Sequence, residues 1–466
     1  MRKKLWLPVV SMLLLTRPSW AADPEMMAAL EGLKKQMVQM QRTISDQNLR
    51  IQQLESKKVL ETPQPNESLK PPAPPQTQVS DKGAKFGGDF RLRMENFKFY
   101  DKNDEAGSTG TANDRERNRY RIRLRWGFEK DYGDDWKVGF RLATGNTTDQ
   151  TSTNQTLGNA GYFNFKTINV DKAYAQYSPN GLKDHGLIKG VTVGGGKFEN
   201  PFFRYSTPIV WDADVTPEGL YEKAVFELAG TGNNKLRVYG TLGQFIVNEN
   251  AGEATDAELY GYQGALNWST RSFNTEEPVD VTLALSYYDY VNYFRTVANN
   301  TASTSYLRTN STALDDPRIL DFYPEVVFYV NRRPLTLWVD RVDNVGSIDQ
   351  TRIDLDSVHG QDTAWGLGFK YGKAKKKGDL EWFYGYYEIG ANAVVAAFSD
   401  SDFGGPGQTG FTNRKGHKFG FAYQLTDNVM VNWTGYVVRP LTPTATVANS
   451  ANESVFRSQA DLSYKF

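Results

Sequence analysis

The sequence of 466 residues contains no cysteine, so disulfide bonds and thiolate metal ligands are excluded. It has only three histidines, His185, His359 and His417, which lie far apart, and no serine–histidine spacing suggests a hydrolase. Basic and acidic residues number 54 each, which gives no excess of positive charge for binding nucleic acid. We therefore expect a protein that is not an enzyme, has no cofactor or metal, and has no nucleic acid partner.

Long apolar runs are also lacking beyond the amino terminus. The mean hydropathy is −0.56, and no later stretch approaches the ~20 apolar residues that a membrane-spanning helix needs. At the amino terminus, Arg2-Lys3-Lys4 precedes the apolar run Leu5–Leu15, and Ser19-Trp20-Ala21 fits a small-x-small cleavage site. Residues 1–21 are predicted to be a signal peptide, because the run is too short for the alternative, a membrane anchor.

Residues 22–60 have apolar residues at alternating steps of three and four, which predicts a left-handed coiled coil. Its expected core positions are Leu30, Leu33, Met37, Met40, Ile44, Gln47, Ile51 and Leu54. The narrow apolar seam favours oligomerisation over the alternative, a helix lying on the next domain. Residues 61–83 are rich in proline and polar residues, which predicts an extended linker.

Residues 84–466 contain sixteen segments with an alternating polarity, of which the last is the clearest. From Phe456 to Phe466, apolar residues alternate almost strictly with polar ones. Side chains alternate faces along a strand, so each such strand has one face for lipid and one for water. The pattern predicts a sixteen-stranded antiparallel transmembrane β-barrel. Aromatic residues near the strand ends are expected at the lipid–water interfaces: Trp126, Trp136, Trp268, Trp382, Trp433 and Tyr464.

The connections between these segments alternate between long and short. Long connections are expected at 144–167, 199–219, 288–324 and 389–417, and tight ones at positions such as 129–135 and 426–428. This asymmetry is typical of bacterial outer-membrane barrels, which have short periplasmic turns and long outer loops. An even number of strands returns both ends of the barrel to one side, so the amino-terminal segments are expected in the periplasm.

The second predicted strand has an arginine at every second position from Arg115 to Arg125, with an aromatic or aliphatic residue between most of them. An arginine in the middle of the bilayer costs about 2–4 kcal/mol, so these arginines are expected to face the interior. The predicted pore-lining residues on the first three strands are Arg91, Arg93, Arg119, Arg121, Arg123, Arg125, Lys137 and Arg141.

Arginines at this density repel one another and need carboxylates close by. Candidates on the strands are Asp89, Glu95 and Glu129. The third long connection, 199–219, supplies further acids, Asp212, Asp214 and Glu218, beside Trp211. A field between the arginines and this loop would favour anions and orient dipolar solutes. The alternative is that the arginines are neutralised locally and select nothing.

Several segments resemble known outer-membrane proteins. The terminal Leu462-Ser463-Tyr464-Lys465-Phe466 resembles the assembly signal of that class. The segments 194–202 and 210–220, with Asn154–Gly158 and Asp171–Tyr174, resemble the "putative porin" family. The resemblance covers roughly residues 80–466. It implies a homotrimeric general porin with sixteen strands in each subunit and with its third long loop folded into the pore.

For partners, the resemblance implies a lipid bilayer with lipopolysaccharide, and small hydrophilic solutes or anions that pass through the pore. The amino-terminal segments resemble the periplasmic extensions of some porins, so contact with peptidoglycan or another periplasmic component is expected there. A protein of another class remains open: a structural or adhesive protein whose coiled coil tethers the envelope and whose barrel is only an anchor.

Overall fold

The computed structural model describes residues 83–100, 116–133, 135–159, 161–203, 207, 209–231, 234–249, 251, 255–271, 277–293, 316–346, 361–404, 412–442 and 454–466. The chain divides into two units, Met1–Thr77 and Gln78–Phe466. The predicted signal peptide, coiled coil and nearly all of the linker lie outside the described residues. Within the described residues, no helix is long and apolar enough to cross a membrane.

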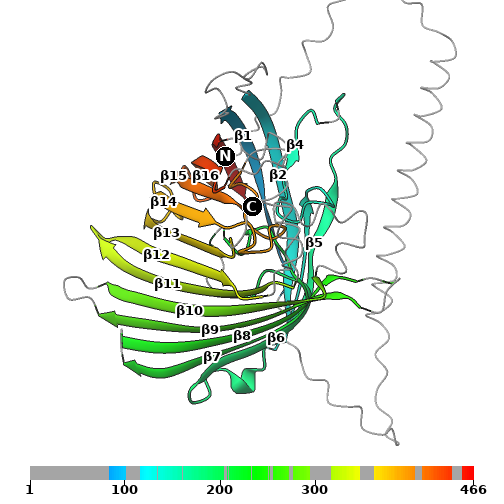
Figure 1. Ribbon diagram of the computed structural model, residues 1–466. Helices are drawn as coiled ribbons and strands as arrows, with labels where there is room; N and C mark the ends of the chain where they lie inside the picture. Colours follow the sequence, from blue (N-terminus) through cyan, green and yellow to red (C-terminus); the bar gives the residue numbers. More distant parts are fainter. Residues whose placement is uncertain are drawn as a thin grey trace, which may run out of the picture. The chain divides into compact units, whose positions relative to one another are not determined.

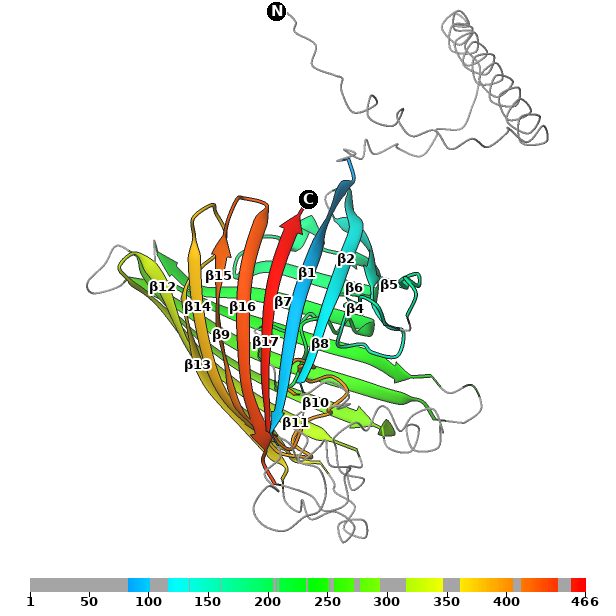
Figure 2. The ribbon, with the colours of Figure 1, turned by 90° about the horizontal axis from the view of Figure 1, so that it is seen from above.

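Sixteen antiparallel strands form the wall of a closed barrel, as predicted (Figure 2). They are β1 (Lys85–Tyr100), β2 (Glu116–Tyr132), β3 (Trp136–Thr144), β5 (Ile168–Tyr177), β6 (Ile188–Lys197), β7 (Glu218–Thr231), β8 (Asn234–Asn248), β9 (Ala257–Arg271), β10 (Pro278–Val291), β11 (Arg318–Val330), β12 (Arg333–Asn344), β13 (Thr363–Gly372), β14 (Leu380–Ile389), β15 (Arg414–Gln424), β16 (Val429–Pro440) and β17 (Ser454–Lys465). Each pairs with its neighbours in sequence, and β1 closes the barrel by pairing with β17.

Two short elements complete the fold. The strand β4 (Gln155–Thr156) pairs with Arg121 and Ile122 of β2, beyond the end of β3. A 3₁₀ turn, η2 (Asn180–Leu182), lies in the connection between β5 and β6. The alternating pattern did not reveal β4, because two paired residues are too few to show a period of two.

Two predicted connections are shorter than expected. The strand β11 begins at Arg318, whereas the expected connection extended to Pro324. Proline lacks a backbone N–H, yet Pro324 is tolerated because the β11–β12 ladder skips this position. The strand β15 begins at Arg414, so His417 is a strand residue.

The two faces of the wall differ as the period of two requires. On β1, Phe90, Leu92 and Met94 are exposed on the outside, while Arg93 and Glu95 between them are buried. Five of the six expected interface aromatics are exposed: Trp126, Trp136, Trp268, Trp382 and Tyr464. The sixth, Trp433, is partly buried and donates its Nε1–H to Ser458 Oγ at 2.9 Å. An apolar outer surface with aromatic residues near the strand ends suits a barrel surrounded by lipid.

The connections alternate between long and short around the barrel, which confirms the prediction. The turn between β11 and β12 has only two residues, Asn331 and Arg332, with φ values of 51° and 60°. Two successive residues with positive φ form the type I′ turn that matches the twist of a hairpin. Long connections lie at the opposite ends of the strands, and three of them reach into the barrel.

The barrel closes on its last residue. The N–H of Gly88 donates to the carbonyl of Phe466 at 3.0 Å, and the N–H of Phe466 donates to the carbonyl of Gly88 at 3.1 Å. A Cβ on Gly88 would lie 2.2 Å from the carbonyl oxygen of Arg125 and 2.8 Å from the ring of Phe466. Only glycine therefore leaves room for the terminal ring between β1 and β2.

We predict that Gly88→Val weakens the closure of the barrel by roughly 1–3 kcal/mol, the usual cost of overpacking. The measurement is the temperature at which the detergent-solubilised barrel unfolds, followed by its heat-modifiable mobility on SDS gels. Gly240→Val is the matched control, because no atom lies within 4 Å of a Cβ at that position. Equal unfolding temperatures for the two variants would contradict the prediction.

Candidate functional site

Three long connections fold into the barrel and narrow it: residues 145–154, 199–217 and 390–404, hereafter the 145, 199 and 390 loops. In the 390 loop, every residue from Ala391 to Ala397 is buried, and in the 199 loop Phe202, Ile209 and Trp211 are buried. Figure 1 shows coil segments of this kind inside the curve of the strands. An outer-membrane barrel of sixteen strands normally encloses a water-filled lumen, so these loops form a constriction.

The 199 and 390 loops are held together by an aromatic cluster. The ring of Trp211 stacks on Phe398 at 5.7 Å and meets Tyr288 of β10 edge-on at 5.5 Å. The N–H of Asp212 donates to the carbonyl of Phe398 at 2.6 Å. Trp211 is 3% exposed, so its ring anchors the loop and offers no open face on which a sugar could stack.

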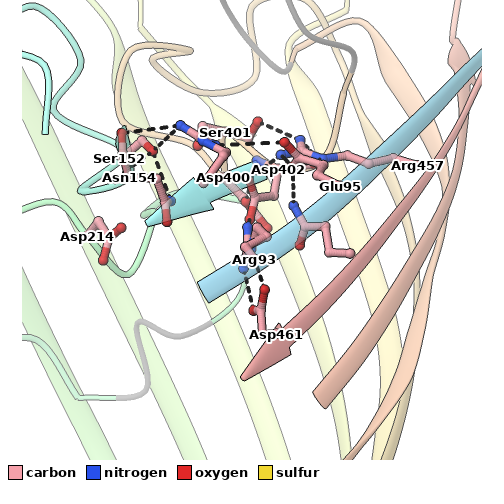
Figure 3. Close-up of polar contacts among 12 residues, drawn as sticks. Arg93, Glu95, Ser152, Asn154, Asp214, Asp400, Ser401, Asp402, Arg457 and Asp461 are labelled. Carbon is pink, nitrogen blue, oxygen red and sulfur yellow. Dashed lines mark hydrogen bonds and ion pairs between the residues drawn. The ribbon is translucent and has the colours of Figure 1, made fainter. Parts of the chain in front are cut away.

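The inward-facing arginines of β1 and β17 are paired across the seam of the barrel. Arg93 binds Asp461 through two hydrogen bonds of 2.7 and 2.8 Å, and its third nitrogen lies 3.0 Å from Asp402 of the 390 loop. Arg457 pairs with Glu95 and lies 2.6 Å from the other oxygen of Asp402. Figure 3 shows these five residues converging from the two strands and the loop.

The arginines of β2 have their own carboxylates. Arg123 and Arg125 bind the two oxygens of Asp89 at 2.6 and 2.7 Å, and Arg119 pairs with Glu95. Arg125 is also 3.4 Å from Asp214 of the 199 loop. The candidate counter-charges Asp89, Glu95 and Asp214 therefore do pair with the arginine face.

Other predicted residues lie differently. Glu218 is the first residue of β7 and binds Lys197 at 2.8 Å, so it is no counter-charge for the arginines of β1 and β2. Arg141 pairs with Asp171 of β5. Lys137 is the second residue of β3, at the end with short connections, and lies 3.7 Å from Glu129.

Sequence reasoning missed half of the carboxylates at the constriction. Asp461 and Arg457 lie on the polar face of the last strand, and the period of two placed them inside without revealing their partners. The acidic Asp400 and Asp402 were missed because the 390 loop was read as an exposed connection. A signal was present: the run Ala391–Ala397 is almost entirely apolar, which is unusual for a solvated loop.

The 390 loop and the 199 loop each contain a carboxyl with a shifted pKa, and the two shifts have opposite directions. Burial opposes the ionisation of Asp402, but Arg457 and Arg93 outweigh it and hold the pKa of Asp402 well below 3.8. For Asp212, burial and the charges of Asp400 and Asp214 act in the same direction and raise its pKa well above 3.8. Asp212 accepts hydrogen bonds from two backbone N–H groups, and no arginine or lysine forms an ion pair with it in the described part of the chain.

Two arginines of the face have the least compensation. Arg91 donates to Asn154 Oδ1 at 2.6 Å, and its nearest carboxylate, Asp461, is 3.7 Å away. Arg121 donates to Ser152 Oγ at 3.2 Å, and Glu95 is 4.0 Å away. The Nε–H groups of both have no hydrogen-bond partner among the described residues.

We predict that Asp402→Asn loosens the 390 loop, because it leaves Arg93 and Arg457 buried beside a neutral amide. Breaking such a buried pair costs roughly 3–5 kcal/mol. The unfolding temperature should fall and single-channel currents should become noisier. Asp427→Asn, in the exposed turn between β15 and β16, is the control.

The pH dependence of this anchor follows from the depressed pKa of Asp402. A carboxyl with a lowered folded pKa contributes its full stability above the unfolded value of 3.8 and loses it as the pH falls through the folded value. Between pH 8 and about pH 5 the wild-type current noise should therefore stay constant. Noise that rises within this range would contradict the assignment.

Comparison with known proteins gives one family. The model of the "Putative porin" family matches residues 106–320 and 328–466. No curated protein matches the sequence.

Solved structures with a similar fold include OprB of Pseudomonas putida at high pH, with a TM-score of 0.46 and 12% identity over 82% of this chain and 94% of that one. OmpF of Salmonella typhi, in complex with daunomycin, has a TM-score of 0.43 and 10% identity over 82% and 97%. A triple mutant of the Rhodopseudomonas blastica porin has a TM-score of 0.38 and 13% identity over 82% and 100%.

Proposed function

Because the chain belongs to the Putative porin family, we propose that its channel lets small hydrophilic solutes diffuse passively across the outer membrane, with a preference for anions. Membership of the family and the closed barrel make it a porin-type channel of the outer membrane and not an enzyme. The observation that carries the proposal is a lipid-compatible wall around a charged interior narrowed by three loops.

Only a few of the inward-facing arginines can contribute to the anion preference. Most of the arginines on β1 and β2 bind carboxylates, and these pairs contribute little net charge to the lumen. Arg91 and Arg121 are paired more weakly, with their nearest carboxylates 3.7 and 4.0 Å away, and we assign the selectivity to them.

We predict that Arg91→Gln/Arg121→Gln lowers the chloride-to-potassium permeability ratio by about two- to five-fold. One charge at about 4–8 Å in water-like surroundings is worth roughly 0.5–1 kcal/mol, which corresponds to this range. Reversal potentials of planar bilayers in a KCl gradient measure the ratio. Lys376→Gln removes a charge from an exposed lysine in the turn between β13 and β14 and is the matched control.

If the double variant and the wild type have the same reversal potential, the arginines are locally neutralised and the anion preference is wrong. The channel itself would still stand in that case.

We also propose that the protein is a homotrimer. Part of the long connection between β4 and β5 supports association, because Tyr162, Phe163 and Phe165 are fully exposed there. Exposed aromatic residues gathered in one loop usually mark a contact surface. The predicted coiled coil of residues 22–60 would add a second contact in the periplasm, where we place the amino terminus.

We predict that Phe163→Ser/Phe165→Ser destabilises the trimer in detergent. Native mass spectrometry or sedimentation should detect a larger fraction of monomer than in the wild type. Val345→Ser changes an exposed aliphatic residue in another outer connection and should leave the oligomer intact. An unchanged mass for the aromatic variant would rule out this loop as the contact.

The remaining partners follow from location. The outer rim of the barrel would meet lipopolysaccharide, and the amino-terminal segment would meet peptidoglycan or another periplasmic component. The alternative of a tether or adhesin with a plugged barrel is separated by liposome swelling, since a plugged barrel passes no sugar.

A further inference from the structure

A small cavity of about 190 Å³ lies where the 199 and 390 loops meet the arginines of β1 and β2. Its lining includes three cationic side chains, Arg91, Arg123 and Lys418, together with the carboxylates of both loops. Most of these charges already have partners. Arg123 binds Asp89 at 2.6 Å, Lys418 binds Asp400 at 3.0 Å, and Asp402 binds Arg93 and Arg457. What the cavity can recognise depends on the groups that are left.

On the cationic side the remaining group is a hydrogen-bond donor. The Nε–H of Arg91 has no hydrogen-bond partner in the described part of the chain, although only 12% of this side chain is exposed. The indole of Trp211, which is 3% exposed, also lines the cavity, but its ring packs edge-on against Tyr288. A buried donor without an acceptor is costly, so the Nε–H of Arg91 favours a ligand with acceptor oxygens.

On the anionic side the remaining group is Asp212. Its oxygens accept the backbone N–H groups of Asp214 at 2.8 Å and Ser401 at 2.9 Å, and it forms no ion pair with the described residues. Its neighbours differ in this respect, because Asp214 lies 3.4 Å from Arg125 and Asp400 lies 3.0 Å from Lys418. Burial and these two carboxyls raise the pKa of Asp212, because they make its ionised form less stable. A bound cationic group would stabilise the ionised form.

One cavity therefore contains an under-compensated cation and an uncompensated acid. A simple anion would satisfy Arg91 but would face Asp212, Asp214 and Asp400. A simple cation would satisfy Asp212 but would be repelled by Arg91, Arg123 and Lys418. A ligand that carries both charges on a short frame satisfies both sides.

We propose that this cavity is a binding site for a small zwitterion of the α-amino acid class, with its carboxylate on Arg91 and its ammonium group on Asp212. The proposal rests on the passive channel proposed above and names a class of solute that this channel retains in transit. Retention at a constriction raises flux at low external concentration, provided that binding is weak enough to permit release.

The test uses single channels of the full-length protein in planar bilayers, with L-alanine as the probe. Three compounds of similar size isolate the charges: propionate carries only the carboxylate, ethylammonium only the ammonium group, and lactamide neither. Each is titrated, and the concentration that gives half of the maximal reduction of the KCl current is compared. We expect L-alanine to act at a concentration at least ten-fold lower than any of the three.

Two variants locate the site. Arg91→Gln and Asp212→Asn should each raise the half-maximal concentration of L-alanine about ten-fold, while Lys376→Gln leaves it unchanged. Heat-modifiable mobility on SDS gels checks that each variant is folded. The comparison of the four solutes uses only the wild-type protein. It therefore tests the zwitterion site even if one of the variants misfolds.

The outcomes are distinguishable. Equal effects of L-alanine and lactamide would overturn the zwitterion site while leaving the channel in place, and equal effects of L-alanine and propionate would reduce it to an anion site. A protein that inserts but conducts no ion would instead overturn the proposed channel function.

Discussion

The structure depends on ion pairs that cross the seam of the barrel from inside. In the ladder between β1 and β17, Arg93 lies directly opposite Asp461, and the two side chains bind each other. Glu95 of β1 reaches Arg457 of β17, and Asp402 of the 390 loop binds an arginine from each strand. Charges buried this deeply are tolerated only when they are paired, so the strands and the loop require one another.

This arrangement explains how a strand with so many arginines folds at all. In the narrowed part of the lumen, where the side chains are largely buried, the alternating face of β2 would be unstable through mutual repulsion without carboxylates close by. Carboxylates come to it from two directions: Asp89 and Glu95 from β1, and Asp214 from the 199 loop. Electrostatic compensation and the narrowing of the lumen are therefore produced by the same loops.

Much of the fold could be predicted from the sequence, because each strand carries its own evidence. The period of two in Phe456–Phe466 and in Arg119–Arg125 is local, and it fixed the number, the faces and the pairing order of the strands. The short strand β4 and the true start of β11 were not predicted, since the first has no period and the second contains a proline.

The site was less predictable, because it is made of contacts between residues far apart in sequence. Parity could place Arg91 and Arg93 inside the barrel, but it could not say that Arg93 is fully paired while Arg91 is not. Asp214 was anticipated because its loop matched a known pattern. Asp400 and Asp402 were not, because their approach to the arginines depends on how an apolar loop packs on Trp211 and Tyr290.

The double attachment of Asp402 has a consequence for biogenesis. Its two arginine partners lie on the first and last strands of the wall, which pair with each other only when the barrel closes. An incompletely assembled barrel accordingly offers the 390 loop half of its anchor. The 390 loop is therefore expected to reach its final position late, after β1 and β17 have paired. A barrel intermediate in the membrane would then have a wide, leaky lumen, and the mature barrel a narrow one.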